Sequence, residues 1–257
     1  MSETKVAAVL NYIKAELYKV CRRKYTWIFF AVMLVLESLF ALVWTGSWEF
    51  SDMVALMTTT MPVGSYLAVI LADLVISDPY KSGTLKNEIS FGIPRMRVYL
   101  GKLCSAVVVS LLFCAVLFSH YLAGCWLLTG HSNPEMIRAN LGILAFVAAA
   151  SLPLWMGTLG LAVALLMTLR SEMLAVIMVF LTITVGTGVL ALLSMIQLEP
   201  IRSIASLVLS ILPSSQFGQY QDALTWDLMV RNWAIGLGWV AVTAAVGLAV
   251  FQRREVK

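Results

Sequence analysis

Six runs of apolar residues, each long enough to cross a lipid bilayer, dominate this 257-residue chain. The hydrocarbon core of a bilayer is about 30 Å thick, so a spanning helix needs roughly 20 mostly apolar residues. The predicted spans are Thr26 to Trp48, Met53 to Ile76, Val98 to Leu128, Leu141 to Leu169, Met173 to Ile196 and Trp233 to Phe251. Because 60% of the residues are hydrophobic and only 12% are charged, we expect a single all-α integral membrane domain over residues 1–257. Glycines within the spans, among them Gly157, Gly160 and Gly236, predict close contacts between helices.

The distribution of cations predicts the orientation of these spans, because Lys and Arg collect on the cytoplasmic side of membrane proteins. If the N-terminus is cytoplasmic, most of the 18 cations fall on that side, and the exceptions are Arg138, Arg202 and Arg231. We therefore expect a multi-pass protein with both termini in the cytoplasm. The first run is longer than the apolar region of a signal peptide and has no small-residue cleavage pattern, so it is expected to stay as an anchor. The net positive charge reports orientation and gives no reason to expect nucleic-acid binding.

Residues 1–24 are predicted to form a helix that lies along the inner membrane surface. Apolar residues recur there every three or four positions, while charged residues occupy other faces. The apolar stripe consists of Val6, Leu10, Ile13, Leu17 and Val20. The alternative is a helix whose stripe packs against a partner protein, which the same pattern would serve.

A polar, broken segment, residues 78–97, separates the second and third spans. Asp78 and Pro79 suit the N-cap and first position of a helix, so a short helix is expected to begin there. Gly92 and Pro94 limit regular structure to short pieces. The segment is longer than the connection that two antiparallel membrane helices need, which favours a docking element. The alternative is a solvated loop whose charge serves orientation only.

Residues 197–230, between the fifth and sixth spans, are expected to form short external or re-entrant helices. The run IRSIASLVLSIL, residues 201 to 212, is too short to span a bilayer and has apolar residues at helical spacing. Pro213 is expected to end this helix. The polar and aromatic stretch that follows is either an external cap or gate, or an ordinary loop.

Two acidic residues and one weak helical segment stand out within the spans. Glu37 lies in the middle of the first span, where a carboxylate is costly unless it is protonated, paired or facing water. We expect it to line a substrate pathway or bind a cationic group, and the alternative is a neutral, hydrogen-bonded acid between helices. Asp73, a further candidate for the pathway, is expected to pair with a basic neighbour at the inner end of the second span. The stretch TTTMPVGS predicts a bend or a lining for a transport path, with Thr59 and Pro62 as candidate pathway residues.

Motifs for several kinds of chemistry are missing. The one Gly-Lys pair, Gly101-Lys102, has no glycine at the spacing that a P-loop requires, so ATP binding by that route is not expected. There is no H-E-x-x-H or G-x-S-x-G motif, and the two histidines are His120 and His131. The four cysteines form no C-x-x-C pair, so neither a metal site nor a disulfide is expected. We therefore expect that the chain is not an enzyme and that any energy source is another protein.

The segment DPYKSGTLKNEISFGIPRMRVYLGKL, residues 78 to 103, resembles the stretch after the second membrane helix in type 2 permeases of ATP-binding cassette (ABC) exporters. That family typically has an acidic residue, then Gly-Thr-aliphatic-Lys/Arg-Asn, a Ser or Thr, Gly-aliphatic-Ser/Thr-Arg, and a Lys that leads into the third helix. The matching residues are Asp78, Gly83, Thr84, Leu85, Lys86, Asn87, Ser90, Gly92, Ile93, Arg95 and Lys102. Pro94 departs from the pattern, which affects the expected local helix geometry. The six spans, the interfacial opening helix and the short external helices also agree with that family.

The resemblance implies that residues 78–97 hold a coupling helix seated in a groove of a separate ATPase subunit. That subunit would carry ATP and Mg, with no cofactor on this chain. The implied coupling residues are Gly83, Thr84, Leu85, Lys86, Asn87, Glu88 and Arg95. Two permeases, expected as a homodimer, and two ATPases would form the working unit in a bacterial cell membrane.

Within that family, this chain is nearest in length and general sequence character to permeases that export lantibiotics, other bacteriocins or amphipathic peptide toxins. The expected function is therefore ATP-driven export of hydrophobic or amphipathic peptides. One alternative is an energy-independent scaffold or immunity protein that binds a peptide without moving it, and another is an exporter whose cargo is a lipid or drug. A secondary transporter is less favoured, because no repeated half is visible.

Overall fold

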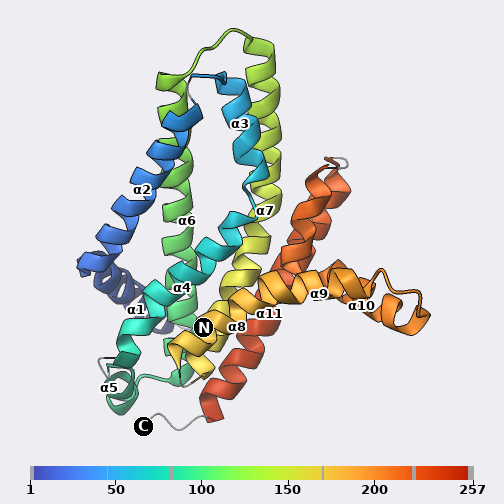
Figure 1. Ribbon diagram of the computed structural model, residues 1–257. Helices are drawn as coiled ribbons and strands as arrows, with labels where there is room; N and C mark the ends of the chain where they lie inside the picture. Colours follow the sequence, from blue (N-terminus) through green and yellow to red (C-terminus); the bar gives the residue numbers. More distant parts are fainter. Residues whose placement is uncertain (1–2, 45, 82–83, 170, 222–223, 254–257) are drawn as a thin grey trace.

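The computed structural model describes residues 3–44, 46–81, 84–169, 171–221 and 224–253, and the regular elements in them are helices (Figure 1). These are α1 (Glu3–Arg22), α2 (Lys24–Trp44), α3 (Phe50–Thr59), α4 (Val63–Lys81), α5 (Thr84–Ser90), α6 (Arg95–Leu128), α7 (Pro134–Thr168), α8 (Glu172–Leu181), a π-helical turn η1 (Thr182–Gly186), α9 (Thr187–Leu193), α10 (Glu199–Ile211), a 3₁₀ segment η2 (Pro213–Gln221) and α11 (Trp226–Arg253). Within this described part, α2, α6, α7, the α8–α9 run and α11 are each long and apolar enough to span a membrane, and α3 with α4 makes a sixth, bent span. The predicted all-α membrane fold is confirmed.

The second predicted span bends by 65° between α3 and α4 (Figure 1). Pro62 lies in this turn, where it lacks the N–H donor that a continuous helix would use. Trp155 of α7 stabilises the break, because its Nε1 donates a hydrogen bond of 3.0 Å to the carbonyl oxygen of Met61. The Trp155 ring lies directly on Gly64, where a Cβ would come within 2.3 Å of it. The bend predicted for the TTTMPVGS stretch is confirmed.

The end of α4 differs from the sequence-based expectation. The sequence predicts a new helix from Pro79, but α4 continues to Lys81 and the next helix begins at Thr84. The N-cap interpretation of Asp78 is therefore wrong, because Asp78 and Pro79 both lie inside α4. A proline deletes one helical hydrogen bond, which bends or weakens a helix without always ending it.

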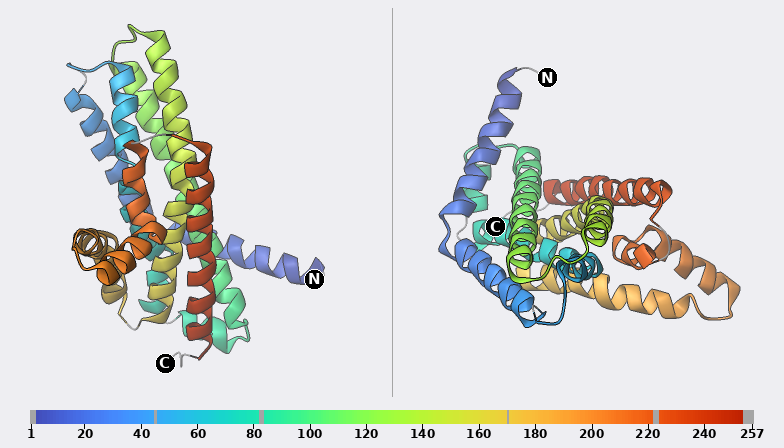
Figure 2. Two further views of the ribbon diagram at one scale, coloured as in Figure 1. Left: turned by 90° about the vertical axis from the view of Figure 1, so that its right-hand side faces the viewer. Right: turned by 90° about the horizontal axis from the view of Figure 1, so that it is seen from above.

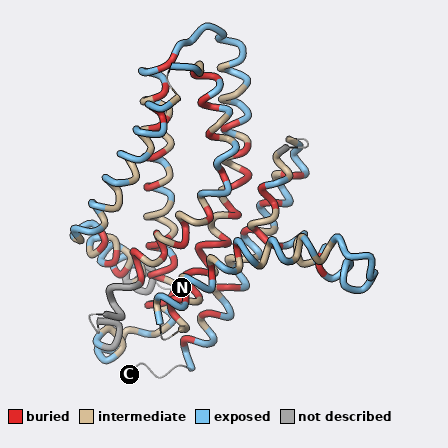
Figure 3. Tube along the Cα trace, in the orientation of Figure 1, coloured by how far each residue is buried: buried red, intermediate tan, exposed pale blue. Residues whose placement is uncertain are grey.

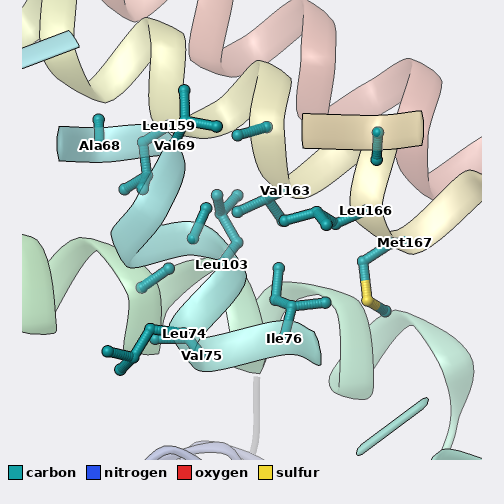
Figure 4. Packing of buried hydrophobic residues seen from close by; sticks show 14 of the residues in the cluster. Ala68, Val69, Leu74, Val75, Ile76, Leu103, Leu159, Val163, Leu166 and Met167 are labelled. Atoms are coloured by element: carbon teal, nitrogen blue, oxygen red, sulfur yellow. The ribbon is translucent and has the colours of Figure 1, made fainter. Parts of the chain in front are cut away.

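The largest apolar core joins α4, α6 and α7 towards one end of the bundle (Figure 4). Val75 of α4, Leu103 of α6 and Val163 of α7 are among its buried residues. The same core takes in Val20 of α1, Val179 of α8 and Phe251 of α11, so six helices meet here. We call this part of the molecule, which also holds α5, the α1 end.

Helix α7 makes its most extensive contact with α11. Gly236 of α11 lies against the backbone of Pro153 in α7, so closely that a Cβ at Gly236 would be 2.1 Å from the Pro153 carbonyl oxygen. Gly157 and Gly160 of α7 approach α11 in the same way, and a Cβ at Gly160 would lie 2.7 Å from the hydroxyl oxygen of Thr243. The close helix contacts predicted from these glycines are confirmed.

Helix α8 packs against α4 and α7, and an arm formed by η1, α9 and α10 continues from it away from the bundle (Figure 2), with much of its surface exposed (Figure 3). Helix α10 buries Ala205 and exposes the apolar side chains of Ile204 and Leu207. The helix predicted over residues 201 to 212 is confirmed, while its re-entrant placement in a membrane stays a prediction. The following segment, η2, packs back onto the bundle with Gln216 fully buried.

Replacing Gly236 with Ala should destabilise the protein, because the new methyl group would overlap the backbone of Pro153 and force α7 and α11 apart. Overpacking of this kind typically costs about 1–3 kcal/mol. The measurement is the Tm of the detergent-solubilised protein, which should fall for Gly236→Ala. Gly238→Ala is the matched control, because a Cβ there meets nothing within 4 Å. Equal Tm values for the two variants would contradict the close contact.

Candidate functional site

A buried ion pair fastens α1 to the beginning of α6. The Lys102 ammonium nitrogen lies 2.7 Å from Oε2 of Glu16, and the two side chains are 0% and 1% exposed. The helices approach closely at this point because Gly101 leaves room for the ring of Tyr12, which a Cβ would meet at 2.3 Å. Two charges in such a place stabilise a fold only as a pair, since either one alone would be an uncompensated buried charge.

Glu88 connects α5 to the same pair. Its Oε1 accepts a hydrogen bond of 2.7 Å from Lys19 of α1, and its Oε2 accepts one of 2.8 Å from the Tyr12 hydroxyl. Lys19 also donates a hydrogen bond of 2.6 Å to Oε1 of Glu16. Each carboxylate oxygen of Glu16 and Glu88 therefore has a donor. We call Tyr12, Glu16, Lys19, Glu88 and Lys102 the α1 network, which runs without a gap from α5 through α1 to α6.

Opposite charges within the α1 network stabilise the ionised forms of Glu16 and Lys19. Burial by itself raises the pKa of Glu16, but the charges and hydrogen bonds of Lys102 and Lys19 outweigh burial and hold that pKa below its ordinary value. Burial lowers the pKa of Lys19, and its hydrogen bonds to the two carboxylates raise it to a net value above the ordinary one. Burial, followed by the charges of the two carboxylates, raises the pKa of Tyr12. At neutral pH these three groups therefore keep the protonation states that their hydrogen bonds need.

Some of the predicted coupling residues lie outside the described part of the chain, and the others are either exposed or hydrogen-bonded within the molecule. Gly83 lies outside the described residues, as do the side chains of Thr84, Leu85 and Lys86. Asn87 is exposed on α5, whereas Glu88 faces α1. Arg95 is bound within the chain, because its guanidinium donates hydrogen bonds of 3.1 and 2.7 Å to the carbonyl oxygens of Phe251 and Gln252 at the end of α11. Glu88 and Arg95 thus hold the coupling region to the bundle.

The structure also points to Phe91, which the sequence analysis did not single out. Its side chain is 86% exposed at the turn that follows α5. Gly92 makes this turn with a φ of 83°, a conformation that residues with a Cβ rarely adopt. A large exposed aromatic residue is typical of a protein–protein contact. The Phe-Gly pair directly after a short helix is the signal that would have identified it.

Glu37 lies on the wall of a cavity of about 390 Å³ between α2, the α3–α4 break, α6 and α7. The cavity is lined mainly by apolar side chains, including Met33, Phe40, Met57, Leu117, Phe118 and Trp155. Oε2 of Glu37 is 3.0 Å from Nδ1 of His120 in α6. Both expectations for Glu37 thus have a basis in the structure, since the acid is hydrogen-bonded between helices and also borders an open space.

The other predicted pathway residues do not line this cavity. The hydroxyl of Thr59, an exposed residue, donates a hydrogen bond of 2.7 Å to a carbonyl of the preceding turn in α3. Pro62 is exposed in the turn, and its neighbours on either side line the cavity. Asp73 is half-buried farther along α4. Their roles in a pathway stay predictions, with Pro62 forming the break on which the cavity depends.

The described residues offer no obvious set of ligands for a metal centre. In the ranges given above, no three His, Cys, Asp or Glu side chains lie close enough together to hold an ion. The four cysteines are free thiols. The polar groups that come together are instead the α1 network and the pair formed by Glu37 and His120.

Residues 12–186, more than half of the chain, match the sequence model of the ABC-2 family of transporter proteins. The chain belongs to this family. The matched residues include the whole α1 network, the coupling region and the Glu37 cavity. The predicted identification as an ABC-2 type permease, the membrane subunit of an ABC exporter, is confirmed, and the family implies an ABC ATPase as partner. No curated protein is similar enough to the chain to be recognised as a relative.

Removing one charge of the buried ion pair should destabilise the permease strongly. Lys102→Met leaves Glu16 without its buried partner, and breaking such a pair typically costs about 3–5 kcal/mol. The double variant Glu16→Leu with Lys102→Met should recover much of the lost Tm, because no buried charge is left unpaired. Lys14→Met, at an exposed position of α1, is the control and should melt like the wild type. A single variant as stable as the double one would contradict the pairing.

The contribution of Glu16 should also depend on pH in a defined direction. Its pKa is lowered in the folded protein, so its stabilising effect is present above the ordinary value of 4.5 and is lost as the pH falls through the lower, folded value. The Tm difference between wild type and Glu16→Gln should therefore be constant near neutral pH and shrink below about pH 4.5. A difference that stays unchanged down to acid pH would show that the Glu16 charge does not stabilise the fold.

Proposed function

We propose that this permease is the membrane subunit of an ATP-driven exporter of hydrophobic or amphipathic peptides, such as a lantibiotic, another bacteriocin or a peptide toxin. A separate ATPase subunit binds ATP and Mg and docks at the α1 end, which faces the cytoplasm together with both termini. Two permeases, as a homodimer, and two ATPases form the working unit in a bacterial cell membrane.

The observation that carries this proposal is the two-sided arrangement of α5. On one side, Asn87 and Phe91 are exposed and available to a partner. On the other side, Glu88 has a side chain only 12% exposed and is hydrogen-bonded to Tyr12 and Lys19 of α1. An element whose one side is exposed and whose other side is hydrogen-bonded to the bundle is suited to transmit a partner's movement to the membrane helices.

The cavity beside Glu37 supports the proposed class of cargo. Its walls are mainly apolar, and Glu37 is the one acidic or basic side chain among the described residues that line it. Sites of this kind favour molecules that are largely apolar and carry a few polar groups. Amphipathic peptides have this composition.

Pulling down the tagged permease from its native membrane in mild detergent should recover an ATP-hydrolysing subunit in stoichiometric amount. Phe91→Asp should reduce the recovered ATPase by about tenfold or more, because loss of an exposed aromatic anchor typically costs at least about 2 kcal/mol of binding. Charge reversal at Glu88 is a less selective test, since it would also disrupt the α1 network.

Gln252→Asp serves as the control, because Gln252 is exposed at the same end of the molecule but lies on α11. It should retain the ATPase. If Phe91→Asp also retains the ATPase, docking through the turn after α5 is contradicted. A wild-type permease that brings down no ATPase would contradict the exporter proposal and favour the energy-independent peptide binder.

A further inference from the structure

Helix α2 rests on the bundle at both of its ends and leaves the Glu37 cavity in between. Near its beginning, Phe29 and Phe30 each contact the ring of Phe113 in α6, with ring centroids 5.5 Å apart. Near its other end, Ala41 is buried in a second apolar cluster with Phe50 of α3. The cavity lies between these two sets of contacts, which hold α2 to the bundle on either side of it.

The polar groups at this place are only partly used by the protein itself. Oε2 of Glu37 pairs with His120, whereas Oε1 makes no hydrogen bond to any residue in the described part of the chain. The Ser38 hydroxyl donates a hydrogen bond of 2.8 Å to the carbonyl oxygen of Leu34. Glu37 also lines a second, smaller cavity of about 100 Å³, together with Ser38 and His120. Glu37 thus borders both cavities, and its Oε1 is left for a ligand.

The chemistry of the cavity limits what it can hold. A volume of about 390 Å³ is within the range of small-molecule sites and is too small for a folded peptide, so one side chain or one aliphatic chain is a suitable occupant. The apolar lining favours an aliphatic chain. His120 already serves Oε2 of Glu37, so Oε1 is the atom at which a cationic or strongly donating group of a ligand would reduce the cost of a charge in apolar surroundings.

We propose that this cavity binds an aliphatic chain ending in an amino group, as presented by a lysine side chain of an amphipathic peptide. The ammonium group binds Oε1 of Glu37, and the methylene chain lies against Met33, Phe40 and Met57. His120 is a positioning residue, since its Nδ1 holds Oε2 and leaves Oε1 for the ligand. The peptide as source rests on the function proposed above, whereas binding of the amine does not require an ATPase.

Trp155 lies on the cavity wall, so quenching of its fluorescence can report binding in the cavity. Purified permease in phosphatidylcholine nanodiscs is titrated with a dibrominated octadecylamine, a quencher of tryptophan fluorescence, and with the dibrominated alcohol of the same length. The amine should bind the wild type about tenfold more tightly than the alcohol, because a hydrogen bond to a charged group adds to the shared apolar contact. A dependence of the binding on Glu37 locates the probe in the cavity.

Glu37→Gln should remove the preference for the amine and leave the affinity for the alcohol within about twofold of the wild type. Glu135→Gln, which changes an exposed acid in the first turn of α7, should retain the full preference. If the wild type binds the amine and the alcohol equally well, the proposed site is wrong, whatever the variants show. Equal loss of both probes in Glu37→Gln also overturns it, because the acid would then be acting on the fold alone.

The source of the amine is tested by competition. An amphipathic peptide with one lysine should displace the brominated amine, and the same peptide with norleucine in place of lysine should not. Displacement by phosphatidylethanolamine in the nanodisc, without displacement by the lysine peptide, overturns the peptide assignment in favour of a lipid headgroup. Because no ATPase is present, these results are independent of the pull-down that tests the exporter proposal.

Discussion

The ion pair between Lys102 and Glu16 determines how the α1 end is built. An unpaired ammonium group in this position would cost several kcal/mol, so Lys102 can lie where it does only when α1 supplies Glu16. Once α1 is held there, Tyr12 and Lys19 are in reach of Glu88, and their hydrogen bonds, together with the packing of Ile89 on the apolar core, hold one side of α5 against the bundle. The exposure of Asn87 and Phe91 on the remaining side follows from this arrangement. The surface proposed for the ATPase thus depends on a charge pair that a partner never contacts.

Much of the fold could be predicted because its signals are local. A run of about 20 apolar residues is sufficient to predict a membrane span, and Pro62 beside a glycine and three threonines is sufficient to predict a bend. The loop motif of residues 78 to 103 identified the family for the same reason, since it lies in one continuous stretch. The N-cap interpretation of Pro79 failed because a local signal of this kind competes with the helix that precedes it, and α4 continued through it.

The candidate site could be predicted only in part, because its pairs are distant in sequence. Glu16 and Lys102 are 86 residues apart, and Glu37 and His120 are 83 apart. Periodicity indicates that Glu16 is off the apolar stripe of α1, but not that this other face is buried against α6. Glu37 was recognisable as an anomaly within its span, whereas its partner and the adjacent cavity required the packing of four elements. Local patterns therefore identified which residues were unusual, and tertiary structure determined what each one contacts.

The energies of the contacts indicate which of them can change when a transporter moves between states. Lys19 is 39% exposed, and exposed ion pairs are worth about 0–1 kcal/mol, so its contact with Glu88 of α5 is easily exchanged. The buried pair of Lys102 and Glu16 costs several kcal/mol to break, so α1 and α6 stay together. α1 leads directly into α2, which carries Glu37, and α6 carries His120, so both members of the polar pair belong to this unit. The opposite wall, formed by the α3–α4 break and Trp155 of α7, lies outside it. A movement of α1, α2 and α6 relative to that wall would change the volume of the cavity without separating Glu37 from His120.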